Sequence, residues 1–140
     1  MNLRIQYNCI DIDWDSVSNT LKSVGMAYFK GEVHKKAFEN SHTVVFVFHN
    51  DELIGFGRAI SDGAYQAAIY DVAVIPKYQG KNIGSKIVSS ILECIPLCNV
   101  ILYAAPDKEA FYEKLNFKKM KTGMALFLDQ EKMKLKGFTE

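Results

Sequence analysis

Residues 70–86 read YDVAVIPKYQGKNIGSK and set how the middle of this 140-residue chain folds. The apolar run at 72–75 has the composition of a strand, and Pro76 stops it. A short loop rich in glycine and polar residues follows at 79–84, and an amphipathic helix opens near Ser85. The N–H groups of a first helical turn are unpaired, and the helix dipole favours negative charge there. The stretch therefore predicts an anion site, with a phosphate or pyrophosphate as its guest.

Regular elements extend outward from this stretch on both sides. Apolar runs predict strands at 3–7, 44–48, 53–60, 67–75, 100–104 and 124–128. Helical spacing predicts helices at about 13–24, 32–40, 81–95 and 108–115. Asp13 or Asp15 is the expected cap of the first helix.

The order of these elements predicts an α/β (α+β) fold with a mixed, mostly antiparallel central sheet of six to seven strands and helices on both faces. Consecutive hairpins in the middle require antiparallel pairing, whereas the strand–helix–strand unit at 67–104 predicts a parallel crossover. The run at 100–104 is apolar throughout, which is typical of a central buried strand. We expect one domain over 1–140, with the charged end at 130–140 as a loosely held tail.

The composition narrows the class of protein. With 17 basic and 16 acidic residues, the formal net charge of +1 argues against a nucleic-acid or membrane partner. No apolar run is long enough to span a membrane, and the start shows no signal-peptide pattern. The three cysteines have no framework spacing and are expected as buried or partly buried thiols in a reducing compartment, the cytoplasm. The histidines show no metal-binding spacing, so no metal is expected.

Three motifs in this chain resemble those of the GNAT N-acetyltransferases, in particular small single-domain members. Residues 71–74, Pro76 and 79–84 are similar to the family's acyl-CoA-binding motif, and 110–117, AFYEKLNF, resembles its second motif, FYEKLGF. Upstream, Asn40-Ser41, residues 53–56, and Arg58 with Asp62 resemble the family's hairpin. The resemblance runs from about 31 to 124, with the motifs in the family's order.

Two positions depart from the family pattern. Asn82 and Asn116 stand where the family usually has glycine. Asparagine is the residue other than glycine that best tolerates a left-handed backbone. We therefore expect both turns to keep their geometry, with less room at Asn82 for a pyrophosphate.

The resemblance implies an acyl-CoA N-acyltransferase fold and acetyl-CoA as cosubstrate. A bulge near Asp71 is expected, because in this family it splays two strands apart. The N–H groups at 80–85 would hold the pyrophosphate, and strand 72–74 would pair with the pantetheine amides. The implied cofactor-binding residues are Val72, Ala73, Val74, Gln79, Gly80, Lys81, Asn82, Ile83, Gly84 and Ser85.

The resemblance also implies catalytic roles. Tyr112 would protonate the departing thiolate, since a phenol with a pKa of about 10 suits a leaving group of similar basicity. Asp71 interrupts an apolar strand, so it is either the base that takes the amine proton or one member of a structural hydrogen bond to the bulge or to Arg58. Tyr28, Phe29, Arg58 and Tyr70 are the candidate substrate-binding residues. An ion pair within the sheet and turn is the alternative for Arg58 and Asp62.

The function expected is transfer of an acetyl group from acetyl-CoA to a primary amine by direct attack in a ternary complex. The acceptor would be a small molecule or a peptide. A non-catalytic sensor or interaction module that binds acyl-CoA through the same fold is the alternative, and a phosphate-loop nucleotide enzyme is excluded by the missing GK[ST] signature. Family members are often dimers, so the apolar last strand is a candidate homodimer interface.

Overall fold

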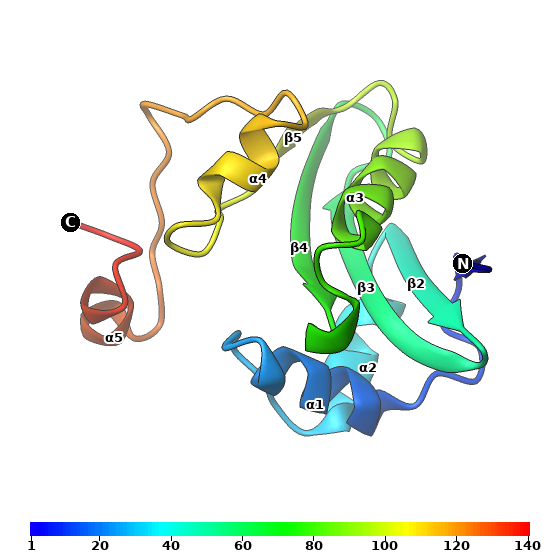
Figure 1. Cartoon of the computed structure of the whole chain (residues 1–140). Helices are drawn as coiled ribbons and strands as arrows, with labels where there is room; N and C mark the ends of the chain where they lie inside the picture. The colour runs from blue at the N-terminus through cyan, green and yellow to red at the C-terminus, as the bar shows by residue number, and fades with distance from the viewer. The chain divides into compact units, whose positions relative to one another are not determined.

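The computed structural model describes residues 1–140 as two compact units, 1–102 and 103–140. The first unit carries one five-stranded sheet in the order β1-β2-β3-β4-β5 (Figure 1). Its strands are β1 (Arg4–Gln6), β2 (Thr43–His49), β3 (Glu52–Ser61), β4 (Gln66–Val74) and β5 (Asn99–Ile101). Neighbours pair antiparallel except β4 and β5, which are parallel, as the predicted crossover requires. The mixed class is therefore confirmed, whereas the expected six to seven strands are wrong.

The helices of the first unit begin and end close to the predicted positions. They are α1 (Trp14–Ser23), α2 (Gly31–Glu39) and α3 (Ile83–Glu93), with a short 3-10 helix η1 (Pro76–Tyr78). Asp13, not Asp15, caps α1, because its Oδ1 accepts the N–H groups of Asp15 and Ser16. Gly25 then takes a φ of 76° and ends the helical path.

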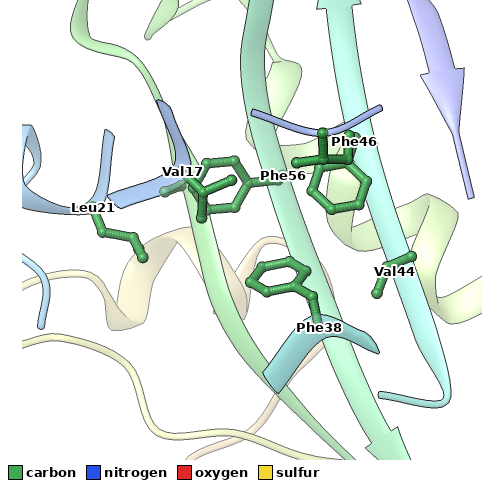
Figure 2. Close-up of a cluster of buried hydrophobic side chains, with 8 residues drawn as sticks. Val17, Leu21, Phe38, Val44, Phe46 and Phe56 are labelled. Atoms are coloured by element: carbon green, nitrogen blue, oxygen red, sulfur yellow. The ribbon is translucent and has the colours of Figure 1, made fainter. Parts of the chain in front are cut away.

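One face of the sheet packs on α1 and α2. Phe38 of α2 lies 5.4 Å from Phe46 and 5.8 Å from Phe56, ring centre to ring centre. Figure 2 shows these three rings with Val17 and Leu21 of α1 beside them. Trp14 is partly buried and lies against the rings of Phe38 and Phe46.

The opposite face packs on α3, so helices cover both faces, as predicted. The apolar side of this helix is buried along its length, at Ile83, Ile87, Val88 and Ile91, and Ile95 just beyond its end is buried too. A side chain on Gly57 would lie about 3 Å from Ile87, Ile91 and Val72. Glycine at this position of β3 therefore lets α3 approach the sheet closely.

The strand β4 carries the bulge that the sequence predicted. Phe56 pairs with Ala73 and Arg58 with Tyr70, so Gly57 faces two residues, Asp71 and Val72. Asp71 takes a φ of 58°, a left-handed conformation that aspartate tolerates better than most residues. Strict alternation would place Tyr70 and Asp71 on opposite faces of the sheet. The bulge breaks that alternation at Asp71.

Two predicted strands are wrong. The run at 100–104 is not a central strand, because β5 spans only three residues at the edge of the sheet and Ile101 is half exposed. The segment 124–128 forms no strand at all, and Met124, Leu126 and Leu128 are almost fully exposed. Apolar alternation describes a residue pattern, but a strand forms only where a partner supplies a hydrogen-bond ladder.

The second unit contains α4 (Glu109–Glu113) and α5 (Gln130–Leu135). The helix α5 replaces the loose tail expected at 130–140, and its cap is Asp129, whose Oδ1 accepts the N–H of Lys132. Tyr103, Phe127 and Phe138 pack edge to face within this unit.

All three cysteines are free, but Cys94 is exposed rather than buried, because it lies at the C-terminal end of α3, off the helix's buried side. None of the helices has the length and apolar character that crossing a membrane requires.

Candidate functional site

The loop before α3 presents a continuous row of unpaired peptide groups. No acceptor in the chain takes the N–H groups of residues 80–85, which we call the cradle loop. The first N–H of this region to be used is that of Lys86, which donates to the carbonyl of Asn82. Six successive donors at a helix start, with no side-chain cap, form a strong site for an anion.

Two left-handed residues shape the cradle loop. Gly80 has a φ of 77° and Asn82 a φ of 63°, so the asparagine keeps the glycine-like turn that the sequence predicted. A side chain added at Gly80 would meet no atom within 4 Å, which shows that the space there is open. Ile83 is buried in the core, so only its backbone can contribute to an anion site.

Positive charge lies beside the cradle loop. The ammonium groups of Lys77 and Lys81 lie 5.7 Å and 5.8 Å from the centre of the Tyr78 ring. The Tyr78 hydroxyl is 2.6 Å from Nδ1 of His49 and is held there. Lys77 is partly neutralised by Glu52 at 3.1 Å, whereas Lys81 has no carboxylate partner. Lys81 is therefore a free cation next to the six donors.

Gln79 connects the loop to the outer edge of β4. Its Nε2 donates to the carbonyl oxygen of Val74 at 3.0 Å. Since Ile75 donates to Ile54 on β3, alternation turns the peptide groups of Val74 and Val72 away from β3. On that side β5 pairs with β4 only at 66–68. The peptide groups of Val72 and the N–H of Val74 are thus open to an extended ligand, whereas the Val74 carbonyl is taken by Gln79 and the side chain of Ala73 is buried in the core.

The bulge brings a carboxylate and a guanidinium together. Nε of Arg58 donates to Oδ2 of Asp71 at 2.7 Å, and the two side chains are 14% and 23% exposed. A pair this close and this buried is structural in part. The structural hydrogen bond between Asp71 and Arg58, one of the two alternatives for Asp71, is therefore present. The second carboxylate oxygen, Oδ1, has no partner in the chain and is not sealed from solvent. Asp71 therefore keeps one free acceptor.

Arg58 is held from several sides. Its Nη1 donates to the Ser41 hydroxyl at 3.3 Å, and its guanidinium carbon lies 5.6 Å from the Phe38 ring centre and 5.5 Å from that of Tyr70. Tyr70 and Arg58 are thus neighbours at the bulge.

The ion-pair alternative holds for Arg58, whose partner is Asp71, but it is wrong for Asp62. Oδ1 of Asp62 accepts the N–H groups of Ala64, Tyr65 and Gln66. These backbone bonds, that of Ala64 first, lower the pKa of Asp62. Asp62 is therefore occupied in closing the turn between β3 and β4.

His34 is a buried polar residue that the sequence reasoning missed. Its Nε2 accepts the N–H of Phe29 at 2.9 Å, and the side chain is 4% exposed. Burial lowers the pKa of His34, the charge of Asp71 raises it, and that of Arg58 lowers it. His34 therefore lies within the electrostatic reach of the ion pair at the bulge. A signal existed in the sequence, since His34 is one helical turn before the core residue Phe38.

The segment between α1 and α2 carries two exposed aromatic rings. Tyr28 and Phe29 are about half exposed. The Phe29 carbonyl accepts the Ser18 hydroxyl, and the ammonium group of Lys22 lies 5.5 Å from the Tyr28 ring centre. The loop is thus tied down while its rings face solvent.

Tyr112 belongs to the second unit, on α4. Its ring packs edge to face on Phe111 at 4.9 Å and on Phe117 at 5.8 Å. The hydroxyl has no hydrogen-bond partner, yet it is not sealed from solvent. Burial raises the pKa of Tyr112, so the phenol stays protonated and able to donate.

Two open hollows lie on the first unit. The larger, about 580 Å³, is lined by polar residues at the starts of α1 and α2, among them Ser18. The second, about 400 Å³, lies between α1 and the β2–β3 turn. Neither is lined by Asp71 or by the cradle loop, so neither coincides with the candidate site. No group of three or more histidine, cysteine or carboxylate side chains is arranged to hold a metal ion.

Residues 40–119, more than half of the chain, match the family model described as an acetyltransferase (GNAT) domain. An uncharacterized N-acetyltransferase, ycf52, from Pyropia yezoensis is 30% identical over 123 residues, which are 83% of this chain and 64% of the relative. A ycf52-like N-acetyltransferase from Prochlorococcus marinus is 35% identical over 109 residues, 73% of this chain and 61% of the relative. The chain thus spans slightly less than two thirds of the length of these curated relatives.

Among solved structures, one of a probable acetyltransferase from meticillin-resistant Staphylococcus aureus superposes with a TM-score of 0.81 and 25% identity. The match covers 91% of this chain and 99% of that one.

Proposed function

Because this chain belongs to the GNAT family of acetyltransferases, we propose that it transfers the acetyl group of acetyl-CoA to a primary amine on a small molecule or a peptide. The observation that carries this proposal is the cradle loop, with six unpaired N–H groups at the start of α3 and Lys81 beside them. A pyrophosphate is the part of acetyl-CoA that such a loop fits.

The edge of β4 supports the next step of the proposal. Pantetheine amides carry the same donors and acceptors as a peptide, so they can pair with the peptide groups of Val72 and with the N–H of Val74. The N–H of Val74 would polarise the thioester carbonyl, which stabilises charge on its oxygen during attack. We propose direct transfer: the amine nitrogen bonds to the carbonyl carbon, the carbon–sulfur bond breaks, and the thiolate receives a proton.

The proton movements are assigned to two residues. The free Oδ1 of Asp71 is the proposed acceptor of the amine proton, directly or through water, while Oδ2 stays on Arg58. Tyr112 is the proposed donor to the thiolate, on the strength of the FYEKLNF resemblance and of its unpaired, protonated hydroxyl. Tyr28, Phe29, Arg58 and Tyr70 are the proposed substrate-binding residues.

The test of this function is thiol release from acetyl-CoA in the presence of a panel of primary amines. We expect release with at least one amine and formation of the matching amide by mass spectrometry. Tight binding of acetyl-CoA without release for any amine would instead support a non-catalytic acyl-CoA sensor of the same fold. The presence of Tyr112 favours the enzyme over the sensor.

Replacing Asp71 with asparagine tests the proposed base. Asparagine tolerates the left-handed φ of 58° and can still accept a bond from Arg58, but it cannot take a proton. We expect kcat/KM for the amine to fall about tenfold near neutral pH, with the acetyl-CoA Kd unchanged. The loss should shrink at higher pH, where more of the amine arrives unprotonated. An equal loss at every pH would assign Asp71 a purely structural role.

We also propose that the protein forms a homodimer through residues 124–128. The exposed side chains of Met124, Leu126 and Leu128 alternate as in a strand without a partner. Antiparallel pairing of residues 124–128 in two copies would cover these three side chains and supply the missing hydrogen-bond ladder. The cytoplasmic location expected from the sequence also stays a proposal.

Light scattering checks the dimer. We expect the mass of the wild type to be twice that of the chain, and Leu126→Lys to give a monomer that melts as cooperatively as the wild type. The matched control is Leu97→Lys, at another exposed leucine, which should leave the mass unchanged. A wild type that is monomeric at high micromolar concentration would contradict this proposal.

A further inference from the structure

Both peptide groups of one loop residue are tied to helices. The N–H of Phe29 donates to Nε2 of His34 on α2, and its carbonyl accepts the Ser18 hydroxyl of α1. The rings of Phe29 and His34 also lie 5.7 Å apart. The backbone of Phe29 is therefore fixed while its ring, 56% exposed, faces solvent. An exposed aromatic ring on a fixed backbone has the character of a contact surface for a ligand.

The anchor at His34 is linked to the bulge. His34 and Phe38 are four residues apart and lie on the same side of α2. The Phe38 ring contacts the guanidinium of Arg58, which in turn holds Asp71. The charges of Asp71 and Arg58 both reach His34. The loop, the histidine and the ion pair thus form one connected set within the first unit.

We propose that His34 is a positioning residue for the amine acceptor: by holding the N–H of Phe29, it sets the loop at 25–31 against the Asp71–Arg58 pair. This inference rests on the proposed function, because it assigns the loop to the acceptor and not to acetyl-CoA. His34 itself touches no reacting atom. Its neutral ring must carry its proton on Nδ1, because Nε2 accepts the Phe29 bond.

A pH dependence follows from this tautomer. Protonation of Nε2 would remove the acceptor and release the loop. Burial keeps the pKa of His34 below its ordinary value, so the bond persists at neutral pH and is lost only on acidification. The charged groups that reach the ring are Asp71 on β4, which favours protonation, and Arg58 on β3, which opposes it. In the window between the folded and unfolded pKa the unfolded chain binds more protons, so stability also falls as the pH falls.

Four variants test the proposal. His34→Leu removes the acceptor, His34→Gln offers Oε1 in its place without titrating, and Ser18→Ala removes the second tie. Ser16→Ala is the matched control, because its hydroxyl on the same helix has no partner. The readouts are hydrogen exchange of the Phe29 amide by NMR and steady-state kinetics with an amine found by thiol release.

We expect His34→Leu to speed exchange of the Phe29 amide and to raise the amine KM about fivefold or more, with the acetyl-CoA KM unchanged. His34→Gln should bring the Phe29 amide exchange rate and the amine KM most of the way back to the wild-type values. Because glutamine does not titrate, the amine KM of this variant should rise less than that of the wild type when the pH is lowered. Ser18→Ala should act in the same direction more weakly, and it decides the matter should His34→Leu fail to fold.

Unchanged exchange of the Phe29 amide in both His34→Leu and Ser18→Ala would contradict the proposal that these side chains hold the backbone of Phe29. Faster exchange with an unchanged amine KM would contradict the proposal that the loop positions the acceptor. Absence of acetyl transfer by the wild type to any amine would instead contradict the proposed function. The exchange measurement does not depend on activity, so the two failures are distinguishable.

Discussion

Tyr112→Phe is expected to lower turnover about a hundredfold while leaving the affinity for acetyl-CoA unchanged. The variant deletes only the hydroxyl, which has no hydrogen-bond partner in the chain. The ring contacts with Phe111 and Phe117 stay, so the fold should lose little stability. Single-turnover acetyl transfer measures the effect, because product release cannot then mask a slower chemical step.

The raised pKa of Tyr112 sharpens this prediction. Burial disfavours the phenolate, so the hydroxyl of the wild type remains a proton donor well above neutral pH. Tyr65→Phe is the matched control, since it deletes a hydroxyl from an exposed tyrosine in the first unit and should leave turnover unchanged. Equal single-turnover rates for wild type and Tyr112→Phe would contradict this role for Tyr112. The thiolate would then depart without a proton from this residue.

The backbone of the cradle loop was predictable because its determinants are local. A strand ending at a proline, then glycine and asparagine, then an apolar helical stripe, specifies the turn almost completely. Asn82 and Asn116 were expected in left-handed conformations, and their φ values are 63° and 72°. The exchange of glycine for asparagine therefore keeps the turn at both places.

The side-chain pairings at the bulge were harder to predict because they are long-range. The bulge itself was expected from the family, but which partner Asp71 would take depends on how the strands pair around it. Once Arg58 pairs with Tyr70 across β3 and β4, the extra residue brings Asp71 onto Arg58. Asp62, next to a glycine in the turn, instead binds backbone N–H groups. Charge alone would pair the Asp62 carboxylate with Arg58, but the hydrogen bonds of the turn hold this carboxylate instead.

The errors at 100–104 and 124–128 share one cause. Both runs have strand-like composition, but composition does not say whether a neighbouring strand is present. At 99–101 only β4 is beside the chain, so a three-residue edge strand forms. At 124–128 no strand pairs with the segment, so no ladder forms. A pattern with period two predicts which side chains share a face of a strand. Whether a neighbouring strand pairs with it depends on residues elsewhere in the sequence.

Ser85→Asp should separate the stability of α3 from its capacity to hold a pyrophosphate. An acidic residue in the first turn favours the helix dipole, so the melting temperature should rise slightly or stay the same. The same charge at the cradle loop would repel the pyrophosphate by about 2 kcal/mol, and the Kd for acetyl-CoA should rise roughly thirtyfold. Titration calorimetry should show weaker binding of acetyl-CoA, while thermal melting should show equal or greater stability.

The control for this variant lies on the same helix. Ser89→Asp adds an identical charge at an exposed position one turn further on, away from the six free N–H groups. It should change the Kd about twofold at most, because the charge is solvated and screened. The loss in Ser85→Asp should also shrink as salt is added, as a charge repulsion must. Equal Kd values for the two variants would mean that the anion does not bind at the cradle loop, since only a site at residues 80–85 distinguishes the first turn of α3 from the second.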